Sequence, residues 1–124
     1  MLSDGGTDSL KVVVCIKRVP DTETHIRISE TGTDIDTRGV KYIISPYDEF
    51  AIEAGLRVKE NMEGGEVSLL TVGASEAQET LRNGLAMGAD KATLLRADSY
   101  MDGLGTAKAL AVELKNSNAQ LILF

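Results

Sequence analysis

Residues 12–16 read Val12-Val13-Val14-Cys15-Ile16, and this continuous apolar run decides the class of fold. A strand with one face in water alternates apolar and polar residues, whereas a strand buried on both faces of a parallel sheet is apolar throughout. Three further runs of this kind follow, at Val67 to Val72, Ala92 to Leu95 and Leu121 to Phe124. We therefore predict four strands of a parallel sheet that is covered on both faces.

Helical periodicity separates the four apolar runs. The first helix is predicted to begin at Ser45-Pro46, because Ser is a favoured N-cap and Pro suits the first helical position. Asp48 stands where the acid of a capping box would lie. Gly64-Gly65 ends this helix. Its inward stripe is predicted to be Tyr47, Ala51, Ala54, Val58 and Met62.

Two more helices are predicted further along the chain. One opens at Ser75, with Gln78 three residues later, and ends at Gly88. The other runs from about Asp102 to Lys115. Its inward residues are predicted to be Leu104, Ala107, Ala111 and Leu114. Strands and helices then alternate along the chain, which implies right-handed crossovers and an α/β fold with helices on both faces of a parallel sheet.

Residues 17–44 interrupt this alternation. They contain Pro20, Gly32, Gly39 and many polar side chains. Two short pieces, residues 25–29 and 33–37, are predicted to pair as a small hairpin after the first strand. An excursion of this length inside a compact domain is unusual, and long loops are often functional.

Composition excludes several classes of function. The chain has 124 residues, of which 43% are hydrophobic and 26% charged, as expected for a folded domain. Thirteen basic and nineteen acidic side chains give a net charge of −6, so nucleic acid is not an expected partner. One Cys and one His cannot form an internal disulfide or a zinc site, and no metal is predicted.

Apolar runs in this sequence are too short to cross a membrane. The longest have about five residues, whereas a membrane-spanning helix needs roughly 20. Residues 1–9 are acidic and rich in Gly, without the basic and apolar regions of a secretory signal, and we interpret them as a disordered leader before a domain at residues 10–124. The sequence therefore predicts a soluble, cytoplasmic protein.

Ligand positions can be predicted from the fold class. In open α/β sheets ligands bind beyond the carboxyl ends of the strands, which makes Cys15, Ile16, Lys17 and Val72 positional candidates. The dinucleotide-binding G-x-G-x-x-G and the P-loop motif are both absent after the first strand and elsewhere. A Ser/His/Asp hydrolase would need His25, which instead reads as a solvated hairpin residue.

Three polar candidates each carry two interpretations. Cys15 is either a nucleophile or a small buried hydrophobe, and the apolar strand around it favours the second. Lys17 and Arg18 are equally well explained as solvated charges or as contacts to an anionic cofactor.

Four stretches together resemble a known family. They have the order and spacing of the β (small) subunit of electron transfer flavoproteins, and the Leu81 to Asp90 pattern L-R-x-x-L-A-x-G-A-D is the most specific part. The stretches are Lys11 to Asp21, Ser45 to Glu53, Gln78 to Asp90 and Leu121 to Phe124.

The resemblance implies a Rossmann-like domain of the adenine-nucleotide-binding superfamily. It also implies a heterodimer in which an α subunit holds most of the redox FAD and electrons pass from flavin dehydrogenases to an acceptor. The β subunit would hold AMP, or a second FAD in the electron-bifurcating branch. It would be an electron carrier rather than an enzyme, a point that the resemblance leaves open for the bifurcating branch.

The family pattern also implies site residues. Matched by motif, the nucleotide contacts are Cys15, the Ser45-Pro46-Tyr47-Asp48 turn and Val72. Ser45 replaces the usual Asn and so lacks an amide that both donates and accepts. Family β subunits continue for about as many residues again, so we interpret residues 10–124 as the N-terminal half of such a domain, without the phosphate-binding loop that follows.

Two functions of different classes remain open at this point. The first is the nucleotide-holding β subunit of an electron transfer flavoprotein. The second is a truncated or stand-alone α/β module for nucleotide binding or protein interaction, without electron transfer. Against the second stands the last strand, whose apolar side chains at Leu121 to Phe124 would lack a cover on one face.

Overall fold

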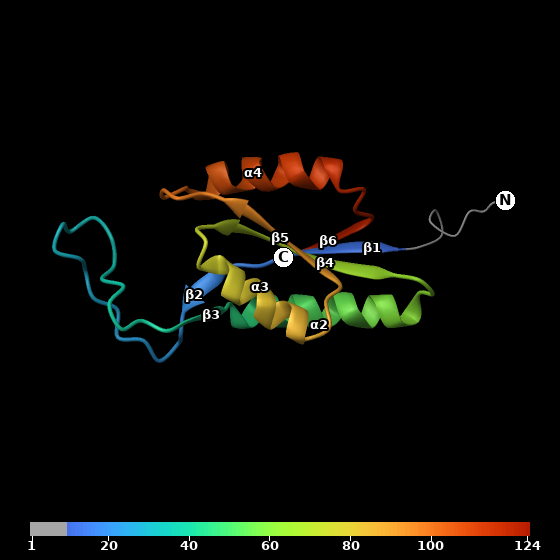
Figure 1. Cartoon of the computed structure of the whole chain (residues 1–124), viewed down its shortest axis with the longest axis horizontal. Coiled ribbons are helices and arrows are strands. Elements are labelled where there is room, and N and C mark those ends of the chain that lie inside the picture. The colour runs from blue at the N-terminus through green and yellow to red at the C-terminus, as the bar shows by residue number, and fades with distance from the viewer. Residues whose placement is uncertain (1–9) are drawn as a thin grey trace.

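The computed structural model describes residues 10–124 and contains the predicted sheet (Figure 1). Its four strands are β1 (Lys11–Cys15), β4 (Glu66–Gly73), β5 (Lys91–Arg96) and β6 (Leu121–Leu123). They lie in the order β5-β4-β1-β6, and every neighbouring pair is parallel. The four apolar runs thus form the four strands, as predicted, and β1 lies inside the sheet between β4 and β6.

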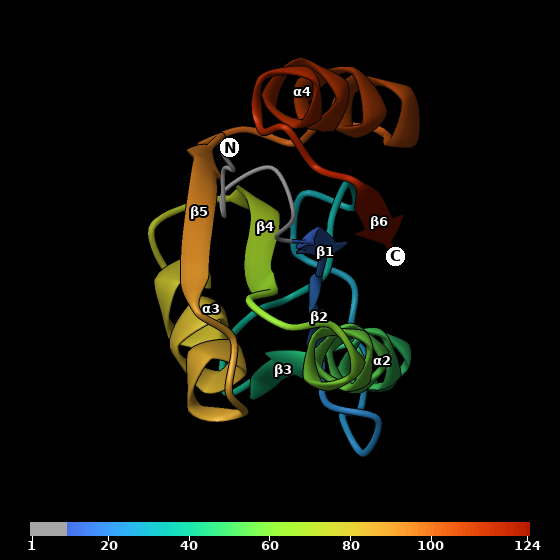
Figure 2. The ribbon, with the colours of Figure 1, turned by 90° about the vertical axis from the view of Figure 1, so that its right-hand side faces the viewer.

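Three helices cover the two faces of this sheet. They are α2 (Pro46–Asn61), α3 (Ala77–Ala86) and α4 (Gly103–Asn116). Figure 2 shows α2 and α3 on one face and α4 alone on the other. The predicted α/β, Rossmann-like class is confirmed: a parallel sheet has helices on both faces. None of the helices within residues 10–124 is long and apolar enough to span a bilayer.

Strand β1 contributes to both halves of the core, which explains its unbroken apolar sequence. Val12 and Val14 are completely buried on the face that carries α2 and α3, where they join Ile52 and Leu69. On the other face, Leu110 and Leu114 of α4 pack against Val13, Cys15 and Leu70. Alternate residues of β1 therefore face two different helical layers.

Helix α2 begins at the predicted residue but buries a different face. Its buried positions are Asp48, Ala51, Ile52 and Gly55, spaced three and four apart. Tyr47 is 79% exposed, Met62 is 46% exposed and Ala54 is exposed as well, so the predicted stripe was wrong at three of its positions. Asp48 and Gly55 occupy interior positions of this helix, and a pattern of apolar residues alone predicts neither of them.

The other two helices differ from prediction in detail. Helix α3 starts at Ala77, two residues after Ser75, because a turn from Ala74 precedes it. Helix α4 starts after Asp102, whose side chain caps it by accepting from the Gly105 amide at 2.7 Å. Four residues of α4 were predicted to face inward, and of these Leu114 is half-buried. The other three are exposed: Leu104, Ala107 and Ala111.

Residues 21–41 form an arm that extends away from the sheet (Figure 1). Strands β2 (Arg18–Pro20) and β3 (Tyr42–Ile44) pair antiparallel at its base, where the Arg18 guanidinium lies 3.8 Å from the centre of the Tyr42 ring. Nearer the tip, a single antiparallel bridge joins Ile28 to Ile35. The predicted hairpin therefore exists, but residues 25–29 and 33–37 are not strands. The leader proposed for residues 1–9 lies outside the described residues.

Asp90, which follows α3, joins three parts of the fold. Its carboxylate accepts from the Val67 amide at 2.8 Å and from Lys59 Nζ at 2.9 Å. The Val67 amide first, and Lys59 second, hold the pKa of Asp90 below the ordinary 3.8. The carboxylate thus links the start of β4 to the last turn of α2.

We expect Asp90→Asn to lower the free energy of unfolding by about 1 kcal/mol at pH 7, after allowance for solvent screening of this partly exposed group. Because the folded pKa is depressed, the ionised group stabilises the protein above its unfolded pKa. That contribution is lost as pH falls below about 4, through the folded pKa. Urea unfolding at pH 7 and pH 3 measures this, and a wild-type advantage that persists undiminished at pH 3 would contradict the assignment.

Candidate functional site

A small cavity lies at the carboxyl ends of β1 and β4, where the fold class predicts a ligand. Its volume is about 210 Å³. Cys15 ends β1, Val72 is the last residue but one of β4, and Asp48 lies in the first turn of α2. The complete lining is Cys15, Ile16, Lys17, Asp48, Val72, Thr106, Leu110 and Phe124. Three distant parts of the sequence that were predicted to form one site thus meet here.

Asp48 is the buried polar group of this cavity. It is only 5% exposed, and its Oδ2 accepts from the Lys17 amide at 2.7 Å. The Lys17 carbonyl in turn accepts from the Ser45 amide at 3.0 Å. The capping-box interpretation of Asp48 was therefore wrong: the Ser45 amide that such an acid would bind is already used by Lys17. Instead, Asp48 ties the end of β1 to the start of α2.

The other residues of the predicted turn do not line the cavity. Ser45 is buried, and its side chain makes no capping hydrogen bond to α2. Pro46 and Tyr47 are exposed on the outside of the helix. Of the six residues predicted as contacts, the structure brings Cys15, Asp48 and Val72 together at the cavity. The other three, Ser45, Pro46 and Tyr47, do not line it.

Sequence reasoning missed three cavity residues from the last third of the chain. Thr106 and Leu110 lie on α4, and Phe124 follows β6. Phe124 reaches the cavity because β6 pairs with β1 and not with β5, the strand before it in sequence. A first strand that is apolar throughout lies inside the sheet and needs a neighbouring strand on each side, and this was the signal that could have found Phe124.

Burial keeps the Cys15 thiol protonated. The side chain is 6% exposed, and desolvation, followed by the nearby charge of Asp48, raises its pKa from 9.0 to about 11. A nucleophilic cysteine needs the opposite shift, toward the thiolate. The structure supports the interpretation of Cys15 as a small buried hydrophobe.

We expect the native Cys15 thiol to react with iodoacetamide at pH 8 at least about 100-fold more slowly than in urea-unfolded protein. Two pH units of pKa difference reduce the thiolate fraction by about this factor, and burial slows access further. Because the chain has one cysteine, mass spectrometry of the labelled protein reports on this thiol alone. Rapid labelling of the native protein would show that the site is open and the thiol activated.

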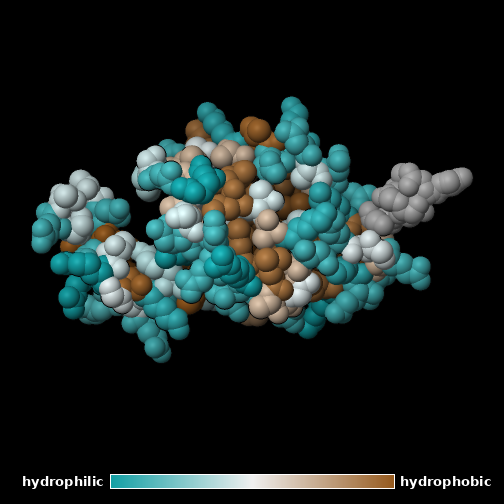
Figure 3. Space-filling view, in the orientation of Figure 1, coloured by the Kyte–Doolittle hydropathy of each residue, from teal (hydrophilic) through white to brown (hydrophobic). Residues whose placement is uncertain are grey.

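A second hollow of about 460 Å³, whose lining contains no charged residue, adjoins the cavity and shares Thr106, Leu110 and Phe124 with it. The exposed Ala107 and Ala111 of α4 line it, and Phe124 is 74% exposed. Ile122 of β6 is also exposed. The predicted uncovered face of the last strand is thus present within the described residues. Figure 3 shows a further apolar surface on another side of the molecule, over β5 and between α4 and α3.

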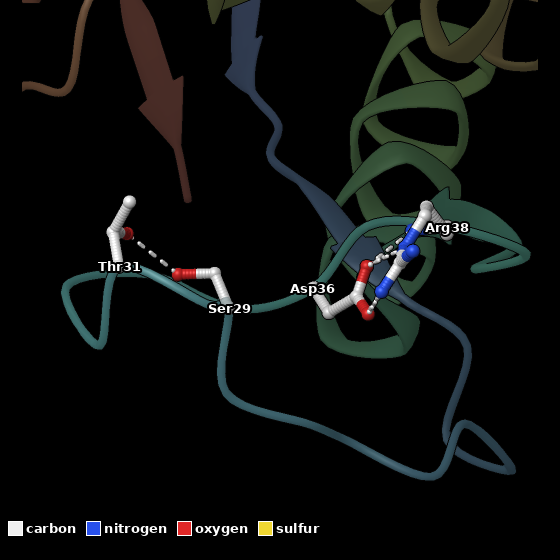
Figure 4. A network of polar contacts seen from close by, with 4 residues as sticks. All are labelled: Ser29, Thr31, Asp36 and Arg38. Carbon is white, nitrogen blue, oxygen red and sulfur yellow. Dashed lines mark hydrogen bonds and ion pairs between the residues drawn. The ribbon is translucent and has the colours of Figure 1, made fainter.

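The arm carries a larger hollow, about 760 Å³, but its lining is mostly polar and exposed. Figure 4 shows two polar contacts of the arm: Ser29 and Thr31 share a hydrogen bond of 2.9 Å, and Arg38 pairs with Asp36 at 2.7 Å. Hydrogen bonds from Arg38 lower the pKa of Asp36 to about 2. His25 is exposed beside this hollow, as the solvated interpretation predicted. In residues 10–124 no three His, Cys, Asp or Glu side chains gather as metal ligands.

Comparison with known proteins identifies the family to which this chain belongs. Residues 33–124 match the electron transfer flavoprotein domain, which is most of the chain. The chain belongs to the electron transfer flavoprotein family. It is 37% identical over 114 residues to an electron transfer flavoprotein subunit beta of Bradyrhizobium diazoefficiens, and 39% identical over 101 residues to the mitochondrial subunit beta of Arabidopsis thaliana. It is also 44% identical over 108 residues to the protein FixA of Azorhizobium caulinodans.

These similarities cover most of this chain but only part of its relatives. The aligned segments are 92%, 82% and 86% of the chain, and 46%, 40% and 38% of the three relatives in the same order. The chain thus spans less than half the length of these relatives. The resemblance to β subunits that the four sequence stretches carry is confirmed.

Proposed function

We propose that this chain is part of the β subunit of a heterodimeric electron transfer flavoprotein. In this role it holds an adenine nucleotide, AMP or a second FAD, and supports an α subunit that binds the redox FAD. The pair carries electrons from flavin dehydrogenases to a further acceptor. The proposal rests on family membership together with one observation: Cys15, Asp48 and Val72 line a single cavity at the carboxyl ends of the strands.

The chain's own residues have a binding role in this proposal. The described cavity offers a buried carboxylate, a protonated thiol and apolar walls, and none of these is an activated nucleophile. When bound, the flavin supplies the redox chemistry, and the protein orients it and controls its surroundings. The chain is accordingly an electron carrier subunit whose side chains position cofactors.

The proposal is tested on the intact protein that contains this chain. It is purified from its own host without added nucleotide and then denatured, and the released molecules are identified by mass spectrometry. We expect one adenine nucleotide per β chain, together with FAD and a second polypeptide that co-purifies. Nucleotide without flavin or a second chain would favour the stand-alone module, and the absence of any nucleotide would overturn the proposal.

A further inference from the structure

We draw no further inference here: the strongest candidate, the second hollow between α4 and the exposed Phe124 ring after β6, carries none, because nothing in the structure of residues 10–124 shows what covers it.

Discussion

Replacement of Ile52 by Ala should lower the free energy of unfolding by about 3–4 kcal/mol. Ile52 is completely buried in the middle of α2, in the core cluster that also contains Val14 and Leu69. Truncation removes apolar contact and leaves a cavity that the close-packed strands cannot fill. This helix is the main cover of β1 on its face of the sheet, so the loss acts on the centre of the domain.

Urea unfolding followed by circular dichroism measures this effect. Phe50→Ala is the matched control, because Phe50 lies two residues earlier in the same helix and is 70% exposed. We expect the control to change stability by less than about 0.5 kcal/mol. Similar losses for the two variants would mean that the outer face of α2 is covered in solution and that burial has been misassigned.

Replacement of Gly84 by Ala should destabilise the protein by about 1–3 kcal/mol, although Ala is the better helix former. A Cβ at position 84 would overlap the Cδ1 atom of Leu69, a completely buried residue of β4. Helix α3 therefore approaches the sheet through the missing side chain of Gly84. Either Leu69 must leave its preferred position or the helix must move outward.

A double-mutant cycle isolates this contact. Leu69→Val shortens the obstructing side chain, so the combined variant should lose less stability than the sum of the two single variants, by about 1 kcal/mol. Gly103→Ala is the control, since nothing lies within 4 Å of the added carbon there. Additive losses in the cycle would contradict a direct clash between position 84 and Leu69.

The sheet was predictable because its signal is strong and local. Unbroken apolar runs such as residues 12–16 have few explanations other than a strand buried on both faces, and Ser45-Pro46 marks the start of α2 through backbone geometry alone. The small strands β2 and β3 gave no such signal. Each has only three half-buried or buried residues, too few for a periodic pattern, and the contact between Arg18 and Tyr42 at the base of the arm joins residues that are distant in sequence.

Helix faces were less predictable, because apolar character alone does not determine which side packs. Asp48 and Gly55 are interior positions of α2, one because its carboxylate binds a backbone amide and the other because it allows close approach to Val12 and Val14. In the site, the two residues at the strand ends lie at the cavity as expected, as does Asp48. Tyr47 does not, since a rotation of about 100° per helical residue turns it outward.

The central position of β1 has a consequence for the order of folding. Its residues pair with β4, some 55 positions later, and the Lys11 amide donates to the Gln120 side chain, 109 positions later. On the ribosome β1 is synthesised before β4 and β6, so its second edge stays unpaired until β6 has been made. Contacts so distant in sequence slow folding. Until β6 has been made, the nascent chain consequently exposes an open edge of valines, and a chaperone that binds it in this interval would have the greatest effect on yield.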